Sequence, residues 1–147
     1  MEPTPDDGLG IHLVELGVLS LEMETVVLRG GPMGTRVIVE FKNVRLVGDR
    51  IRARQRGGTA ADWLVVGPDA TATLDIRMTL ATDDGALIFV HGGGRTDANT
   101  FPKGGAMWFA PIFETADPRY GWLNAIQAIG KGRAAGDHAT FRLYEAR

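Results

Sequence analysis

An aspartate and an arginine in the middle of the chain have side chains that could carry out proton transfer. Asp62 stands beside Trp63, and a carboxyl group partly buried against an aromatic ring has a raised pKa, which suits a general base. Arg77 follows Asp75 by two residues, so both lie on one face of a strand. If that face lines a pocket, Arg77 can stabilise an oxyanion formed when a proton leaves. The alternatives are turn hydrogen bonds for Asp62, a core position for Trp63 and a structural or solvated ion pair for Arg77.

Three residues later in the chain could orient an aromatic ligand. Tyr120, Trp122 and Asn124 share a face if their segment is extended, and they would provide a phenol donor, a stacking ring and an amide. The alternative is a tyrosine hydrogen-bonded at a strand corner and a tryptophan that fills the core. Asp83 and Asp84 lie in a turn, and turn geometry can explain both acids without a ligand.

The sequence predicts neither a metal nor a nucleotide cofactor. His12, His91 and His138 lie on three distant segments without the spacing of metal ligands. The triple glycine Gly92–Gly94 lacks the strand–loop–helix setting and the Lys-Ser/Thr ending of a phosphate-binding loop. We therefore expect any chemistry to use protein side chains alone.

Four arginines alternate along one face of a predicted strand. They are Arg50, Arg52, Arg54 and Arg56. Such a row of guanidinium groups can bind phosphate or a carboxylate ligand. The chain is acidic overall and the row has no interleaved aromatic residues. We therefore favour a solvated outer face and expect no nucleic-acid partner.

Composition indicates a protein that buries a core without covalent staples. The chain has 147 residues, a formal net charge of -2 and no cysteine, which excludes disulfides, zinc ribbons and thiol nucleophiles. No apolar run approaches the roughly 20 residues that cross a bilayer. Residues 1–8 have neither the basic region nor the apolar core of a signal peptide. We expect a disordered lead at 1–8, a cytoplasmic location and no membrane partner.

A hairpin over residues 70–90 positions the acid–arginine pair. Polar and apolar residues alternate from Thr71 to Leu80, which indicates a strand with two unlike faces. The segment Thr82-Asp83-Asp84-Gly85 then favours a turn, and an apolar run continues to Val90.

Further strands are expected on both sides of this hairpin. Residues 11–28 predict one bent strand or two, because valines and a central glycine outweigh the helix-forming leucines and glutamates. The other predicted strands lie at residues 36–41, 44–55, 62–66, 107–113, 122–129 and 139–145. With 20 glycines and no convincing helix, the pattern predicts a single all-β domain over residues 9–147. We expect an antiparallel barrel or sandwich of about 8–10 short strands, and favour the barrel.

Two segments are predicted to be flexible. The fifteen residues from His91 to Gly105 offer almost nothing to pack, and long loops in a compact domain are commonly lids or disordered. The glycines at 92–94 and 104–105 would be the hinges of a mobile cover. Residues 130–136, rich in glycine and alanine, are predicted to be a flexible connection.

Seven short motifs, taken in order, resemble those of one family. They are Gly34-Thr35-Arg36, Ala61-Asp62-Trp63, Leu74-Asp75-Ile76-Arg77, Thr82-Asp83-Asp84-Gly85-Ala86, Phe113-Glu114-Thr115, Arg119-Tyr120-Gly121-Trp122-Leu123-Asn124 and Tyr144-Glu145. None is specific alone, but their order over residues 34–145 is similar to that of the bacterial and fungal domain-of-unknown-function family DUF3237.

The resemblance implies a small closed β-barrel, often dimeric, with a central cavity. Some fungal members of the family close rings in natural-product pathways by adding a hydroxyl group across an alkene without a cofactor. The resemblance also favours Asp84 as a site residue. In this chain Thr59-Ala60 separates Gly57-Gly58 from the Ala-Asp-Trp motif, and the segment between Val90 and Met107 is shorter than in the family, so the cover of the cavity differs.

We predict a cofactor-independent acid/base enzyme, of cyclase or isomerase type, that acts on a small aromatic or polyketide-like molecule as a homodimer. Asp62 would move the proton, Arg77 would hold the oxyanion and Tyr120 would donate a hydrogen bond. The residues expected to bind substrate are Arg36, Trp63, Asp75, Asp84, Trp122 and Asn124. The alternatives are a non-catalytic carrier or sensor with its ligand in the barrel, and a structural module whose barrel is filled by side chains.

Overall fold

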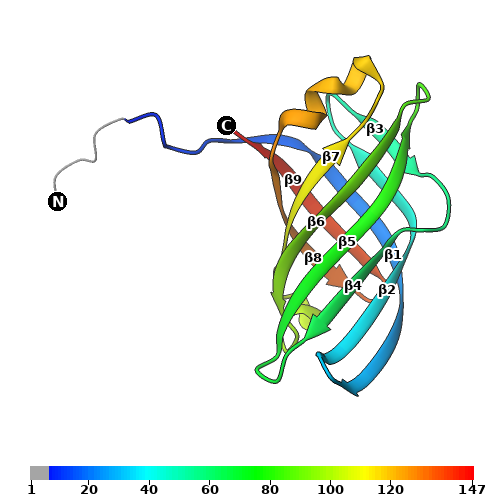
Figure 1. Ribbon diagram of the computed structural model, residues 1–147, viewed down its shortest axis with the longest axis vertical. Coiled ribbons are helices and arrows are strands. Elements are labelled where there is room, and N and C mark those ends of the chain that lie inside the picture. The colour runs from blue at the N-terminus through cyan, green and yellow to red at the C-terminus, as the bar shows by residue number, and fades with distance from the viewer. Residues whose placement is uncertain (1–6) are drawn as a thin grey trace.

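In residues 7–147, the part of the chain that the computed structural model describes, nine antiparallel strands form a sheet that closes into a barrel (Figure 1). The strands are β1 (Leu13–Gly31), β2 (Gly34–Val47), β3 (Arg52–Gln55), β4 (Ala61–Val66), β5 (Thr71–Thr82), β6 (Leu87–Asp97), β7 (Met107–Glu114), β8 (Ala128–Ala135) and β9 (His138–Ala146). The predicted all-β barrel is confirmed. Residues 1–6 of the predicted disordered lead lie outside the described residues.

The order of the strands determines which ones face each other across the barrel. β3 and β4 occupy one position together, because each pairs with β2 on one side and with β5 on the other. Round the ring the order is β1, β9, β8, β7, β6, β5, then β3 with β4, then β2, which pairs with β1. β4 therefore lies across the barrel from β8.

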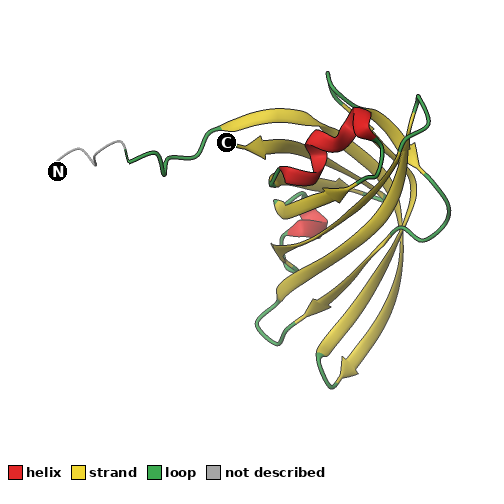
Figure 2. Ribbon diagram, turned by 45° about the horizontal axis from the view of Figure 1, so that its top comes forward, coloured by secondary structure: helices red, strands yellow, loops and turns green. Residues whose placement is uncertain are grey.

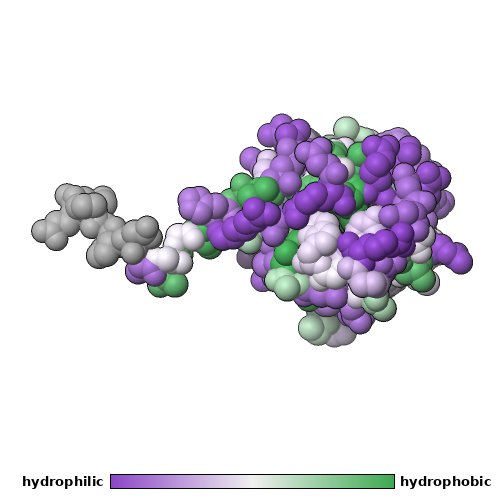
Figure 3. Space-filling model, turned by 90° about the horizontal axis from the view of Figure 1, so that it is seen from above, coloured by the Kyte–Doolittle hydropathy of each residue, from purple (hydrophilic) through white to green (hydrophobic). Residues whose placement is uncertain are grey.

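Two short 3-10 helices lie at opposite ends of the barrel. Helix η1 (Phe101–Lys103) connects β6 to β7, and helix η2 (Pro118–Ala125) connects β7 to β8. Figure 1 shows η2 across one end of the barrel and the β6–β7 connection, which contains η1, towards the other, and Figure 2 shows both helices in red. Seen from the η2 end, the surface is mostly hydrophilic (Figure 3). No helix in residues 7–147 has the length and apolar character needed to cross a membrane.

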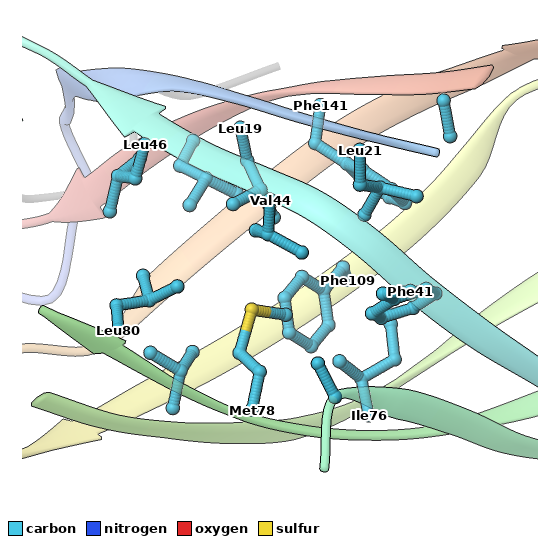
Figure 4. Close-up of a cluster of buried hydrophobic side chains, with 14 of the residues drawn as sticks. Leu19, Leu21, Phe41, Val44, Leu46, Ile76, Met78, Leu80, Phe109 and Phe141 are labelled. Carbon is cyan, nitrogen blue, oxygen red and sulfur yellow. The ribbon is translucent and has the colours of Figure 1, made fainter. Parts of the chain in front are cut away.

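Large side chains fill the half of the barrel nearer η2. Leu46, Met78 and Leu80 are buried there (Figure 4). Phe109 meets Phe141, which also lines the cavity of the other half, edge-on with ring centroids 5.9 Å apart. Alternate residues of each strand contribute to this core, as the period of two predicts. The η2 half therefore has a packed core, and the cavity described below lies in the η1 half.

The first and central predicted elements are confirmed. β1 is one long strand, and its register shifts against β9 between Glu15 and Gly17 and against β2 between Ser20 and Glu22. These register shifts are β-bulges, which bend a strand, and they agree with the bend that was predicted at Gly17. The hairpin is present as β5 and β6, with Ala81 paired to Leu87 before the turn.

The prediction of a loop at residues 91–105 is wrong for residues 91–97, which belong to β6. Gly92, Gly93 and Gly94 pair with β5 on one side and with β7 on the other. A Cβ atom at Gly92 would collide with the carbonyl oxygen of Ala110, and one at Gly94 with that of Trp108. Gly92 and Gly94 therefore permit the close approach of β6 and β7, and the three glycines are part of a strand and not a hinge.

The prediction of a strand at residues 122–129 is wrong for its first half, which forms the end of η2. The Asp117 side chain caps this helix by accepting a hydrogen bond from the amide of Arg119 (2.9 Å), and Pro118 follows at the first helical position. β8 then starts at Ala128 and pairs with β9. The predicted flexible connection at 130–136 is therefore mostly strand.

The prediction of one strand over residues 44–55 is also wrong, because a turn interrupts it. β2 starts earlier than expected, ends at Val47, and the amide of Gly48 donates to the carbonyl of Ile51 (2.8 Å) before β3 begins. Arg52 and Arg54 on β3 point outward and are exposed. The predicted solvated face is present at these residues.

Candidate functional site

A cavity of about 350 Å³ occupies the η1 half of the barrel. Apolar side chains from β1, β2, β4, β5, β7, β8 and β9 form most of its wall, and Phe101 and Pro102 of η1 also line it. Ligand sites in proteins commonly have volumes of about 300–1,000 Å³ and apolar walls with a few polar groups. The cavity is therefore large enough for a small organic molecule.

Asp62 is the buried acid in the wall of this cavity, and only 4% of its surface is exposed. It lies on β4, where Asp62 and Leu64 point inward and Trp63 points outward by strand alternation. β4 and β5 pair at Asp62–Ile76 and again at Val65–Thr73. Between these pairs the Asp75 amide donates a hydrogen bond to Asp62 Oδ1 (2.8 Å).

The environment of Asp62 suits proton transfer near neutral pH. Its pKa is raised to about 7. Burial is the main cause, the hydrogen bond from the Asp75 amide lowers the pKa in part, and the negative charge of Asp75 raises it. Oδ2 has no hydrogen-bond donor among residues 7–147. Asp62 can therefore be protonated or ionised near pH 7 and has one oxygen available to a ligand.

The other polar groups of the cavity are few and peripheral. Thr25 is exposed near the β1–β2 turn, and Asp137 is an exposed residue whose carboxylate lies 2.6 Å from Nδ1 of His138. Among residues 7–147, no lysine, arginine or histidine lines the cavity. The described residues also contain no cluster of metal-ligating side chains. In residues 7–147 the cavity thus offers a ligand an apolar wall and one buried carboxyl group, that of Asp62.

Four of the predicted site residues lie on the outer surface of the barrel. Arg77 and Asp75 point outward from β5, with 59% and 51% of their side chains exposed, and Arg77 Nε lies 3.6 Å from Asp75 Oδ1. Arg36 donates from its guanidinium to the carbonyl oxygen of Trp63 (2.7 Å). Trp63 is the fourth, and it points outward from β4. The structure therefore does not bring these side chains into the cavity with Asp62. Asp75 and Arg77 form a solvated ion pair on the surface, which was the alternative to a role in a pocket.

Two more predicted site residues form a hydrogen-bonded cluster at the η2 end. The Tyr120 hydroxyl lies 2.8 Å from Asp84 Oδ1, which also accepts from the hydroxyl of Thr82 (2.6 Å). A guanidinium nitrogen of Arg119 lies 3.3 Å from Asp84 Oδ2. Hydrogen bonds from Thr82 and Tyr120, with the charge of Arg119, lower the pKa of Asp84, and the same contact raises the pKa of Tyr120. This cluster ties η2 to the β5–β6 turn.

The remaining two predicted residues also hold the η2 segment in place. The Arg50 guanidinium carbon lies 4.2 Å from the centre of the Trp122 ring, and Arg50 also pairs with Glu145 (2.7 Å). Asn124 accepts from the amide of Thr115 (2.8 Å) and donates to its carbonyl oxygen (3.0 Å). The expected shared face of Tyr120, Trp122 and Asn124 does not form, because their segment is helical.

The sequence reasoning missed the cavity wall that β8 and β9 provide. Ala134, Ala139 and Phe141 line the cavity, as do Phe101 and Met107. A signal for β8 was present in the sequence. Small residues alternate with larger or charged ones from residue 128 to residue 135, which is the pattern of a strand with a small-residue face.

Comparisons with known proteins agree with the barrel. A β-barrel-like protein from Acinetobacter baumannii AYE is 26% identical, with a TM-score of 0.82 and 99% of both chains covered. A conserved protein of unknown function from Rhodopseudomonas palustris is 19% identical, with a TM-score of 0.84 over 94% of this chain and 99% of that one. A structure described as an enzyme from Penicillium herquei is 19% identical, with a TM-score of 0.76 over 100% of this chain and 98% of that one. The last two show a shared fold.

The family comparison covers nearly the whole barrel. Among curated proteins, none matches the chain. The model of the family described as "Protein of unknown function (DUF3237)" matches residues 11–146, which include every strand and both helices. The chain therefore belongs to the DUF3237 family.

Proposed function

We propose that this protein is a cofactor-independent acid/base enzyme that acts on a small organic molecule in the barrel cavity. The observation that carries the proposal is Asp62, a buried carboxyl group with a pKa of about 7 and a free Oδ2 in an apolar cavity. A general base works best when its pKa lies near the operating pH. Arg77 and Tyr120 lie outside the cavity, so we assign the proton transfer to Asp62 alone.

The proposed reaction moves one proton out of the substrate and back into it. Ionised Asp62 takes a proton from a carbon or a hydroxyl group of the substrate, and the protonated carboxyl then returns it to another carbon. In an isomerisation the double bond moves between these two steps. In a ring closure the substrate hydroxyl oxygen forms a bond to one alkene carbon, and the proton held by Asp62 goes to the other. Both reactions are redox-neutral and regenerate the carboxylate.

The fold comparison is consistent with this class of function. The protein from Penicillium herquei that shares the fold is described as an enzyme. Its identity to this chain is 19%, so the proposal depends on Asp62 and the cavity and not on that likeness.

The proposal is tested by screening phenolic, polyketide-like and enone compounds for binding and then for conversion. A ligand that binds the folded protein raises the melting temperature, so thermal shift identifies candidates, and chromatography detects the product. Asp62→Asn should abolish conversion while the protein still folds and binds. Asp83→Asn, an exposed acid in the β5–β6 turn at the η2 end, is the control and should retain conversion. A fully active Asp62→Asn variant would refute the assignment.

A carrier that stores a metabolite is the second candidate function. The observation in its favour is that most of the cavity wall is apolar, which is sufficient for binding without chemistry. A carrier would bind compounds from the same screen and convert none of them at any pH. Conversion that rises with ionisation of a group near pH 7 would exclude it.

A further inference from the structure

The part of the cavity wall across the barrel from Asp62 consists of small side chains. Asp62 is on β4, and β8 is the strand across the barrel. Ala134 of β8 and Ala139 of β9 are directly paired, buried, and line the cavity. Methyl groups therefore stand on the wall that faces the buried carboxyl group.

Larger residues at other inward positions of β8 and β9, and of the strands beside them, occupy the interior of the barrel. Leu143 is buried, and the Phe141 ring lies so close to Gly132 that a Cβ atom at Gly132 would collide with it. The space between Asp62 and the opposite wall thus remains open where both paired residues are alanine. A larger residue at Ala134 or Ala139 would shorten the cavity along the line that a ligand needs to reach Asp62.

The charge of the cavity limits the ligand to uncharged compounds. No cationic side chain lines it, and the one buried side chain that ionises is an acid. An anionic ligand would lose its hydration without gaining a partner and would face the negative charge of ionised Asp62. A neutral hydroxyl group, in contrast, can donate to Oδ2 of the carboxylate.

We propose that the Ala134–Ala139 pair sets the size limit for an uncharged ring compound whose polar group contacts Asp62. This inference deepens the proposed function and rests on the same cavity. An engineered cavity of about 150 Å³ holds benzene. The volume here, about 350 Å³, is more than twice that figure and suits two fused rings.

The test compares phenol, 2-naphthol and 2-naphthoate as ligands of the full chain at pH 7 by isothermal titration calorimetry. We expect phenol and 2-naphthol to bind. 2-Naphthoate, which has the same ring system and a negative charge, should bind at least about tenfold more weakly than 2-naphthol. Equal affinity for naphthol and naphthoate would overturn the charge argument. Failure of both phenol and naphthol to bind would overturn the proposal.

Substitution of Ala134 tests the size limit. Ala134→Leu should weaken the binding of 2-naphthol at least about tenfold and leave the affinity for phenol within about threefold of the parent value. A few methyl groups in an apolar pocket discriminate between ligands by roughly this factor. Ala135→Leu is the matched control, since Ala135 is the next residue of β8 and is exposed on the outer face. It should bind both compounds like the parent protein. Equal loss of both compounds in Ala134→Leu, or no loss of either, would overturn the size limit.

A milder substitution separates the size limit from a folding defect. If Ala134→Leu does not fold, Ala134→Val should show the same order of losses with smaller factors, and unchanged naphthol affinity in that variant would refute the proposal. These measurements use binding alone. A protein that shows the predicted size series but converts no substrate would retain this inference and lose the proposed enzyme function.

Discussion

The raised pKa of Asp62 makes the stability of the protein depend on pH. Below about pH 4 the carboxyl group keeps its proton in both the folded and the unfolded chain. Between about pH 4 and pH 7 the unfolded chain releases the proton and the folded protein retains it, so the free energy of unfolding falls as the pH rises. The total loss is roughly 4 kcal/mol and is complete above pH 7.

Urea unfolding of the parent protein and of Asp62→Asn at pH values from 4 to 8 measures this effect. The uncharged amide has no proton to release, so the difference in the free energy of unfolding should change steadily in favour of the variant up to about pH 7 and then stay constant. A pH-independent difference would show that Asp62 titrates normally in the folded protein.

Tyr120 tests whether the cluster at the η2 end is separate from the cavity. Tyr120→Phe removes the hydroxyl group that contacts Asp84 and leaves the ring, so hydrogen exchange of the η2 amides should become faster. The affinity for 2-naphthol should not change, because the cavity lies in the η1 half. A loss of naphthol affinity without faster exchange would instead place Tyr120 in the ligand site.

At the residue scale, the sequence predicted Asp62 as the candidate base because an acid beside a tryptophan indicates burial. It could not predict that Arg77 points away from Asp62. Alternation along β5 shows that Asp75 and Arg77 share a face, but nothing in that pattern says whether the face is inside. The barrel decides this through the apolar residues of β5, which are larger and must be buried.

At the scale of elements, the glycines of β6 allow two strands to lie closer than side chains would permit. Gly94→Ala should lower the stability by about 1–3 kcal/mol, because the new methyl group collides with the carbonyl oxygen of Trp108. Gly93→Ala is the matched control, since the one atom within 4 Å of its Cβ atom would be the carbonyl oxygen of Leu74, at 3.4 Å. Urea midpoints of the two variants provide the comparison, and equal midpoints would contradict the packing argument.

The elements that the sequence failed to predict have a common cause. Strands β6 and β8 contain glycine and alanine at positions where a strand usually has branched residues, so local propensity indicated a loop. Both strands exist because neighbours on each side supply the hydrogen bonds. Helix η2 was missed for the opposite reason, since Tyr120 and Trp122 favour a strand and the cap at Asp117 and Pro118 decides otherwise.

At the scale of the whole molecule, apolar surface remains uncovered in one copy. Leu9 and Ile11 are exposed in the segment before β1, which leads away from the barrel (Figure 1), and Leu13, the exposed first residue of β1, continues their alternation. Leu13 also lines a shallow groove with Trp108 and Ile129, which are exposed on β7 and β8. Exposed apolar patches of this kind commonly mark protein interfaces. We propose that a second copy covers this surface in a homodimer.

Light scattering after gel filtration tests the dimer. The parent protein should have twice the 15.8 kDa mass of one chain, and Ile11→Asp should shift the population towards the monomer. Met33→Asp is the control, because Met33 is equally exposed but lies in the turn between β1 and β2. A parent protein of monomeric mass would refute the proposal.

The sequence predicted the closed barrel as a class, because short alternating segments at even spacing require many antiparallel neighbours. It could not predict that one half would be packed and the other hollow. That difference depends on which inward positions of neighbouring strands meet, such as the alanines Ala134 and Ala139 in the cavity wall. Such pairs are known only once the register is known.

The pairing of β1 with β9 closes the ring between the two ends of the barrel sequence. Leu13 pairs with Ala146, so the contact that closes the ring joins residues far apart in sequence and carries a large loop-closure entropy. Until β9 is synthesised, β1 and β8 each have an unpaired edge that can join another chain. Because β9 supplies Ala139 and Phe141 to the cavity, the complete ligand site exists only once β9 has joined the sheet.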